Sequence, residues 1–261
     1  MAEVLRVEGK RPMGMSIRIS KERDRDWVSR AVWVARSGPH AESFRYLALR
    51  LGAELESRAR SSLLITSALP QEGKTLTACN LALAFASLAT TERVALVDLD
   101  LRVPRVASAF HLRPRIGIVE VLARDASLQS AAIVTDAALD IYPVAGRRPA
   151  AHELLARPEL ADVIKQLEAR YRWVICDTGP ALLVPDVQII APHVGACMAV
   201  VRSGKTPRSA LEELGKRLPR ERMVGFFLND ARPPRHARRY YRSAYYHDDS
   251  EPDDESDKEA R

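Results

Sequence analysis

Apolar residues in the middle of the chain occur either in short unbroken runs or at every third or fourth position. Unbroken runs are typical of strands in a parallel sheet covered on both faces, and the wider spacing is typical of helices. The runs predict strands at residues 62–67, 93–98, 139–144, 173–177, 197–202 and 223–228. The helical spacing is found over residues 41–58, 75–89, 117–123, 152–169, 186–191 and 207–217. This alternation predicts an α/β fold, a doubly wound and mostly parallel sheet flanked by helices.

The two ends of the chain differ from this central pattern. Residues 1–37 mix charged and apolar positions without a clear period, and we interpret them as an N-terminal extension. Pro233 and Pro234 end the regular pattern, and a basic, then tyrosine-rich, then acidic segment follows. Because this segment has few apolar residues to bury, we expect a domain at 38–231 and a flexible tail at 232–261.

Composition argues against several kinds of protein and site. The chain has 261 residues, of which 46% are hydrophobic and 28% charged, as expected for a globular protein. Cys79, Cys176 and Cys197 are isolated, which argues against a structural zinc site, an iron–sulfur cluster or a disulfide framework. The apolar stretch 181–201 is interrupted by prolines and an aspartate, and residues 1–15 lack the apolar core of a signal peptide. We therefore expect a cytoplasmic protein without a transmembrane segment.

The segment Ser67–Thr75, which reads Ser-Ala-Leu-Pro-Gln-Glu-Gly-Lys-Thr, lies between a predicted strand and a predicted helix. It resembles a phosphate-binding loop (Walker A), in which a glycine admits the phosphate and amides at the helix start face the anion. Lys74 would then reach the β- and γ-phosphates, and the Thr75 hydroxyl would ligate Mg²⁺. Ala68 replaces the usual first glycine, so an ordinary surface turn is the alternative for the loop taken alone.

Two other predicted strands end in aspartate. One leads into Asp98-Leu99-Asp100-Leu101-Arg102, and the other ends at Asp177, in the manner of a Walker B strand whose carboxylate holds Mg²⁺. Alternation along a strand would put Asp98 and Asp100 on one face, where a cation would offset their repulsion. Solvated loop aspartates are the alternative, and Asp186 is either a helix N-cap or part of the same site. Together with the phosphate loop, these strand ends predict a Mg-nucleotide site.

Four of the seven tyrosines lie close together in the tail, at Tyr240, Tyr241, Tyr245 and Tyr246. Flexible phenols can enter a neighbouring active site, lose a proton to a carboxylate and accept the γ-phosphoryl group of a nucleotide. A partner-docking or stacking segment is the alternative, and the adjacent acidic block argues against nucleic acid as the partner. We interpret the cluster as a set of phosphate acceptors.

On these motifs the chain resembles the cytoplasmic catalytic domain of the bacterial tyrosine kinases that govern capsule and exopolysaccharide production. It is most similar to the stand-alone form, whose membrane-spanning part is a separate protein. The likeness runs from Glu42 to Tyr246 and includes Pro143–Gly146, Glu153–Leu155 and Gly225–Asn229 besides the motifs above. It implies a P-loop architecture related to the MinD and ParA ATPases, ATP and Mg²⁺ as cofactors, and tyrosine autokinase activity in trans on the tail tyrosines.

The resemblance also implies a role for each matching residue. Lys74, Asp98 and Asp100 would be catalytic, with Asp98 the preferred base, and Asn229 would read the adenine edge. The metal would be held by Thr75, Asp100 and Asp177. The nucleotide would contact Ala68, Gln71, Glu72, Gly73, Lys74, Thr75 and Leu76. Gln71 stands where the family usually has a glycine, so the loop has less freedom at positive φ.

Implied partners are a membrane-spanning polysaccharide co-polymerase adaptor, which would hold the protein at the inner face of the membrane, and a cognate tyrosine phosphatase. Family members form rings through a Glu-x-x-Arg-x-x-Arg helix, and here Glu42 and Arg45 match while Ala48 replaces the last arginine. Two alternatives to the kinase are a catalytically weak nucleotide-binding scaffold of an export complex and a MinD- or ParA-like ATPase. The ATPase is disfavoured because Leu69 stands where those proteins carry a second lysine.

Overall fold

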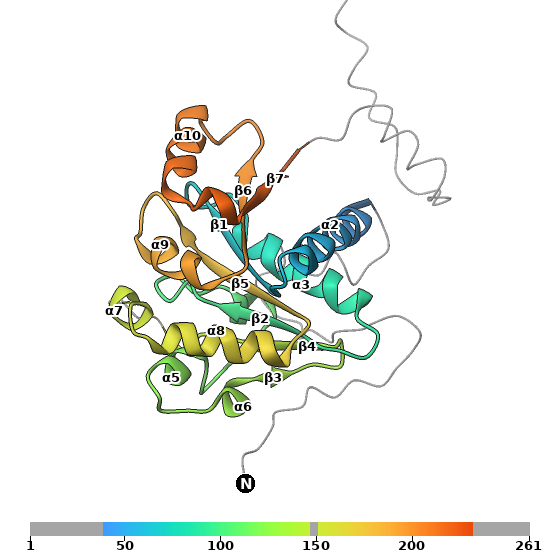
Figure 1. Ribbon diagram of the computed structural model, residues 1–261, viewed down its shortest axis with the longest axis vertical. Coiled ribbons are helices and arrows are strands. Elements are labelled where there is room, and N and C mark those ends of the chain that lie inside the picture. The colour runs from blue at the N-terminus through green and yellow to red at the C-terminus, as the bar shows by residue number, and fades with distance from the viewer. Residues whose placement is uncertain (1–38, 147–150, 232–261) are drawn as a thin grey trace, which may run out of the picture. The chain divides into compact units, whose positions relative to one another are not determined.

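The computed structural model describes residues 39–146 and 151–231, which build a seven-stranded sheet with helices on both faces (Figure 1). The strands are β1 (Ser62–Ser67), β2 (Val94–Asp98), β3 (Ile133–Val134), β4 (Leu139–Tyr142), β5 (Trp173–Pro180), β6 (Ala196–Arg202) and β7 (Met223–Asn229). Their order is β3-β4-β2-β5-β1-β6-β7, and every pairing is parallel except that of β3 with β4. The predicted doubly wound sheet is therefore confirmed.

Helices cover both faces of the sheet. They are α2 (Pro39–Ser57), α3 (Lys74–Leu88), α4 (Val106–Ala109), α5 (Ile118–Leu122), α6 (Leu128–Ala131), α7 (Ala151–Leu155), α8 (Glu159–Arg170), α9 (Asp186–Ile190) and α10 (Arg208–Arg217), with short 3-10 turns η2 (Ala191–His193) and η3 (Arg220–Arg222). Helices α2, α3 and α4 lie on one face and α5 to α10 on the other. Among the described residues, none of these helices combines the length and the apolar character needed to cross a membrane.

Alternate residues of the fully buried strand β1 enter two separate hydrophobic cores. Leu63 and Ile65 pack with α2 and α3 on one face, whereas Leu64 packs with α5, α8 and α9 on the other. Helix α3 is buried over most of its length, which explains why it is apolar on all sides. Burial on both faces explains the unbroken apolar runs of the strands.

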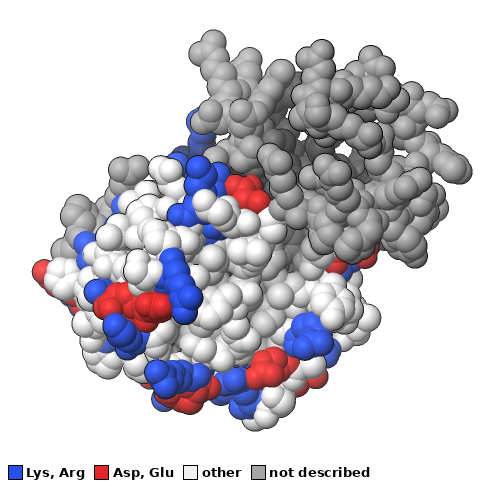
Figure 2. Space-filling view, turned by 90° about the horizontal axis from the view of Figure 1, so that it is seen from above, with Lys and Arg blue, Asp and Glu red and all other residues white. Residues whose placement is uncertain are grey.

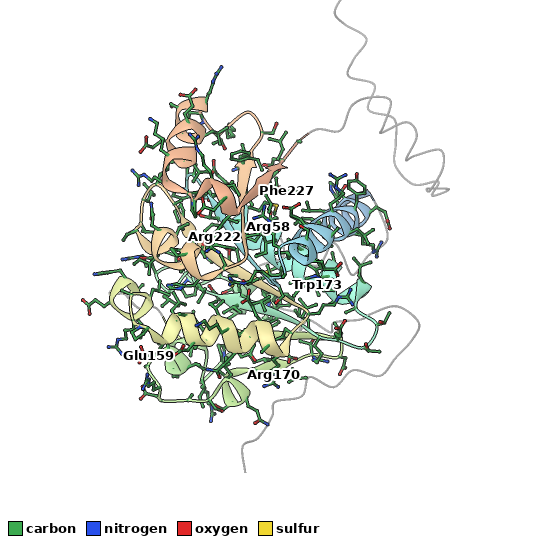
Figure 3. The ribbon with its side chains drawn as sticks, in the orientation of Figure 1. Arg58, Glu159, Arg170, Trp173, Arg222 and Phe227 are labelled. Carbon is green, nitrogen blue, oxygen red and sulfur yellow. The ribbon has the colours of Figure 1, made fainter. Side chains whose placement is uncertain are left out.

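Aromatic rings join α2 and α3 to the sheet. Phe227 of β7 and Trp173 of β5, both labelled in Figure 3, contact Phe44 and Phe85 at ring-centroid distances of 5.5 and 4.7 Å. Ala48 of α2 is fully buried in the same core. The helix predicted at 41–58 is thus confirmed, and Ala48, which stands where the resemblance implies an arginine, faces this core.

The structure corrects the predicted helix at 152–169, which is two helices, α7 and α8. Pro158 takes the N-cap position of α8, where its missing N–H costs nothing, and it would break a helix that continued through it. Helices α4 and α6 and strand β3 were not predicted because they span two to four residues, too few for a period to be recognised.

Charged groups at the surface and in the interior are paired in different ways. Figure 2 shows Lys and Arg next to Asp and Glu on the face seen from above, and such exposed pairs contribute little to stability. In the interior, the buried Asp140 accepts hydrogen bonds from Arg93 Nη2 at 2.6 Å and from the Tyr171 hydroxyl at 2.7 Å. The Tyr142 and Tyr171 hydroxyls lie 2.8 Å apart. This network fixes β4 to the end of α8.

We expect Tyr171→Phe to lower the free energy of unfolding by about 1–3 kcal/mol, because it leaves a buried oxygen of Asp140 without its donor. Tyr142→Phe should cost less, since it removes the hydroxyl that contacts Tyr171 but leaves both donors to Asp140 in place. Urea unfolding of the two variants measures the difference. Equal losses of stability in the two variants would mean that the hydrogen bond to Asp140 contributes no more than the contact between the two tyrosine hydroxyls.

Candidate active site

The phosphate loop lies at the carboxyl end of β1, which is flanked by β5 on one side and β6 on the other. Gly73 has φ 96° and caps the start of α3, and Lys74 is the first residue of that helix. The next two residues of α3 are Thr75, which is buried, and Leu76, which packs against the hydrophobic core between α3 and the sheet. The strand–loop–helix arrangement predicted for this segment is confirmed, and it directs the first amides of a long helix toward the loop.

Glu72 and Asn229 brace the phosphate loop from two sides. The Glu72 carboxylate is 4% exposed, accepts the Leu69 N–H at 2.8 Å and also accepts the Thr206 hydroxyl. Asn229, at the end of β7, donates its Nδ2 to the Glu72 carbonyl at 2.9 Å. The amide that we expected to read the adenine edge thus holds the loop. The contribution of Thr206 was missed because no motif in the sequence marks it.

Gln71 lies in the left-handed region with φ 61°, where a side chain is disfavoured. We expect Gln71→Gly to raise the free energy of unfolding by about 0.5–1 kcal/mol, because the relieved strain exceeds the added entropy of glycine in the unfolded chain. Gln71→Ala, which keeps the β-carbon, is the control and should change stability little. Chemical denaturation of the three proteins tests this, and a destabilised glycine variant would contradict it.

The aspartates of the two other motif strands meet at the same edge of the sheet. Asp98 and Asp177 are register partners at the carboxyl ends of β2 and β5. Strand β2 ends at Asp98, so the expectation that Asp98 and Asp100 share one strand face is wrong. Asp100 lies beyond the strand, with Oδ2 3.2 Å from Lys74 Nζ and Oδ1 accepting the Val103 N–H at 3.0 Å.

Asp98 turns its carboxylate toward the backbone that follows it. Its two oxygens accept the N–H groups of Asp100 at 3.2 Å and Val106 at 3.1 Å. Burial, and next the charge of Asp177, raise the pKa of Asp98 well above the usual range for a carboxyl group. Asp98 therefore organises the stretch that carries Asp100, in addition to any part in chemistry.

Asp177 is fully buried, and neither of its carboxylate oxygens has a hydrogen-bond partner among the described residues. Burial raises the pKa of Asp177 to about 7, against the opposing influence of the Lys74 ammonium and of the nearby Thr75 hydroxyl, which is not in hydrogen-bonding geometry. A buried carboxylate without a donor is costly, and a cation would satisfy it. The set Thr75, Asp100 and Asp177 offers the hard oxygen ligands that Mg²⁺ prefers.

The remaining predicted residues are placed as follows. Asp186 is the first residue of α9 rather than its N-cap, which is Pro185, and its buried carboxylate accepts two hydrogen bonds from Arg102. Glu42 and Arg45 form an ion pair with one another within α2. Ala68 is fully buried at the start of the loop. The four tail tyrosines lie outside the described residues.

Known proteins resemble this chain in sequence and in structure. No family profile matches the chain. The tyrosine-protein kinase YwqD of Bacillus subtilis is 32% identical over 200 residues, which cover 75% of this chain and 84% of that protein. The succinoglycan biosynthesis transport protein ExoP of Rhizobium meliloti is 32% identical over 208 residues, but these cover 77% of this chain and only 26% of ExoP.

Two solved structures illustrate the fold. The kinase domain of the Escherichia coli tyrosine kinase ETK is 26% identical with a TM-score of 0.66 and covers 74% of this chain and 78% of that one. MinD from Pyrococcus horikoshii, complexed with Mg-ADP, is 23% identical with a TM-score of 0.53, covers 68% of this chain and 75% of its own, and shows the fold alone. With YwqD matched over most of its length, the chain belongs to the family of bacterial tyrosine-protein kinases.

Proposed function

We propose that the protein transfers the γ-phosphoryl group of ATP to the tail tyrosines Tyr240, Tyr241, Tyr245 and Tyr246 of a neighbouring copy, and that this regulates capsular or exopolysaccharide synthesis. The observation that carries the proposal is the buried Asp177 carboxylate, which lies near Lys74 and has no hydrogen-bond partner in the described part of the chain. Family membership supports the reaction, and the similarity to ExoP, a succinoglycan biosynthesis transport protein, supports the process.

The residues of the site would have different roles in phosphoryl transfer. Mg-ATP, when bound, would supply the γ-phosphoryl group, and its Mg²⁺ would supply positive charge that offsets the negative charge of the phosphates. Amides at the start of α3 and the Lys74 ammonium would bind the phosphates, while Thr75, Asp100 and Asp177 would hold Mg²⁺. A tyrosine oxygen would attack the γ-phosphorus as the bond to ADP breaks, and the phenolic proton would pass to Asp98. We take Asp98 as the base because each of its oxygens accepts one backbone N–H and keeps a second lone pair for the proton.

A membrane-spanning polysaccharide co-polymerase adaptor is a further partner that we propose. The likeness to ExoP, a succinoglycan biosynthesis transport protein of which the aligned residues cover 26%, supports an association with polysaccharide transport. A cognate tyrosine phosphatase would reverse the modification. Assembly into a ring would use the α2 surface around Glu42 and Arg45, which are at least partly exposed, whereas Ala48 is buried and unable to take part.

Phosphotyrosine formation with Mg-ATP, followed by immunoblotting of the purified full chain, tests the proposal. Lys74→Met and the variant with all four tail tyrosines changed to Phe should each lose the signal. Lys216→Met and Tyr46→Phe are the matched controls, because both residues are exposed, and they should keep it. Bound ATP without phosphotyrosine would indicate a scaffold, and ATP hydrolysis without phosphotyrosine would indicate a MinD- or ParA-like ATPase.

The direction of transfer is tested by mixing two variants. Lys74→Met retains the acceptor tyrosines, and the tyrosine-to-phenylalanine variant retains the catalytic site. Transfer in trans predicts that the mixture regains phosphotyrosine, and that the label appears on the Lys74→Met chain. A mixture without signal, when wild type is active, would show that transfer occurs within one chain.

A further inference from the structure

The stretch between Asp98 and α4 carries Asp100 but has no regular secondary structure of its own. Backbone amides fix its start and its end, since Leu99 N–H donates to the Asp177 carbonyl at 2.8 Å and Val106 N–H donates to Asp98. Between these points, Arg102 reaches out of the stretch to α9, with Nε 2.8 Å from Asp186 Oδ2 and Nη2 3.1 Å from Oδ1. The middle of the stretch is thus tied to a helix that follows β5.

Asp186 is a firm anchor for Arg102. Its side chain is 2% exposed, and it opens a helix whose Val187 and Ile190 are fully buried. A carboxylate at this depth is stabilised by a charged partner that meets both oxygens, and the planar guanidinium of arginine provides this geometry. Because α9 is held by the core, the pair restrains the position of Arg102 rather than that of Asp186.

The restraint on Arg102 also fixes the position of Asp100. Arg102 immediately precedes Val103, whose N–H donates to Asp100 Oδ1, and the other oxygen of Asp100 meets Lys74 Nζ. The end of β5 also passes close to Asp100, since a β-carbon placed on Gly179 would lie 3.7 Å from Asp100 Oδ1. One ion pair therefore controls where the loop between β2 and α4 sits against the segment after Asp177.

We propose that Arg102 and Asp186 are a positioning pair that holds Asp100 in register with Lys74 and Asp177 for phosphoryl transfer. The inference rests on the proposed function and extends it to two residues outside the reacting groups. Neither is a catalytic residue, because each acts through the backbone at Val103. A misplacement of Asp100 of about 1 Å would slow phosphoryl transfer by about 100-fold. The phosphate loop is held by Glu72 and Asn229, so its affinity for the nucleotide would be kept.

Arg102→Gln, Asp186→Asn and the double variant test the pair in the full chain. In nucleotide-free protein, hydrogen exchange at the Val103 and Val106 amides should quicken by about 10–100-fold, with the amides of β4 unchanged. The kcat for phosphotyrosine formation should fall by about 10–100-fold, while the Kd for a fluorescent ATP analogue changes less than about threefold. The double variant should be no worse than the worse single variant, because both changes remove the same interaction.

Arg93→Gln is the matched control, because Arg93 also binds a buried aspartate, Asp140, with Nε and Nη2. It should destabilise the fold but leave kcat and the exchange at Val103 unchanged. Equal loss of kcat in the Arg93 and Arg102 variants, additive losses in the double variant, or unchanged exchange at Val103 would each overturn the inference. If wild type forms no phosphotyrosine, the proposed function fails, and the exchange measurement still decides whether the pair holds the loop.

Discussion

Asp177→Asn should abolish phosphotyrosine formation and at the same time stabilise the nucleotide-free protein. The stabilisation follows from the burial of a carboxylate that has no hydrogen-bond partner among the described residues. We expect the free energy of unfolding to rise by about 1–3 kcal/mol at pH 8, because the variant removes a buried charge whose desolvation the Lys74 ammonium only partly offsets. Loss of a metal ligand should reduce the rate of phosphotyrosine formation by more than about 100-fold, since charge stabilisation dominates phosphoryl transfer.

The stabilising effect should depend on pH. Burial raises the pKa of Asp177 to about 7 in the folded protein, above about 3.9 in the unfolded chain. The folded state therefore binds the proton more tightly, so this group favours folding most below its unfolded pKa and loses that contribution as pH rises through about 7. The gain from Asp177→Asn should accordingly be larger at pH 8 than at pH 5, as measured by urea unfolding at both values.

A second buried strand aspartate provides the control. Asp140 is as deeply buried as Asp177, but Arg93 and Tyr171 satisfy its oxygens. Asp140→Asn should therefore destabilise the protein, which is the opposite sign for the same chemical change. If both variants lose stability at pH 8, the Asp177 carboxylate has a compensating partner in the nucleotide-free protein, and its assignment as a cation ligand would be wrong.

The arrangement of the sheet was predictable because it depends on local pattern and on topology. Unbroken apolar runs require strands buried on both faces, and parallel strands place their carboxyl ends at one edge. That reasoning predicts one site for Lys74, Asp98 and Asp177, and in the structure Asp98 and Asp177 are register partners on neighbouring strands. Periodicity was less informative for short elements, and at Pro158 the apolar pattern continues across the break between α7 and α8.

The contacts that tune the site could not be predicted from the sequence. Glu72 meets Thr206, and Arg102 meets Asp186, across 134 and 84 residues of chain. Such pairs depend on where loops from different strands cross, which no local period encodes. The position of Asp100 was mispredicted for a similar reason, because the strand ends two residues earlier at Asp98 and the loop then takes its direction from tertiary hydrogen bonds. Motif reading thus identifies the reacting groups more readily than the residues that hold them.

Gly73→Ala should disable the phosphate loop more severely than any other single methyl group added to it. Gly73 has φ 96°, where a side chain is strained, and a β-carbon there would lie 2.1 Å from Asn229 Nδ2. The amide would have to move and give up its bond to the Glu72 carbonyl. We expect the free energy of unfolding to fall by about 2–3 kcal/mol from strain and the lost bond, and affinity for ATP to fall by about 100-fold, equivalent to about 2.7 kcal/mol.

Two comparisons separate the causes of this loss. Gly215 lies in α10 with open space around its α-carbon, so Gly215→Ala should stabilise the protein slightly, by up to about 1 kcal/mol. Combining Gly73→Ala with Asn229→Ala removes the collision but keeps the strain at positive φ. Because the two single changes share one contact, their combined cost should be less than their sum. Additive losses would show that Asn229 moves aside freely, and the strain at Gly73 alone would then account for the defect in nucleotide binding.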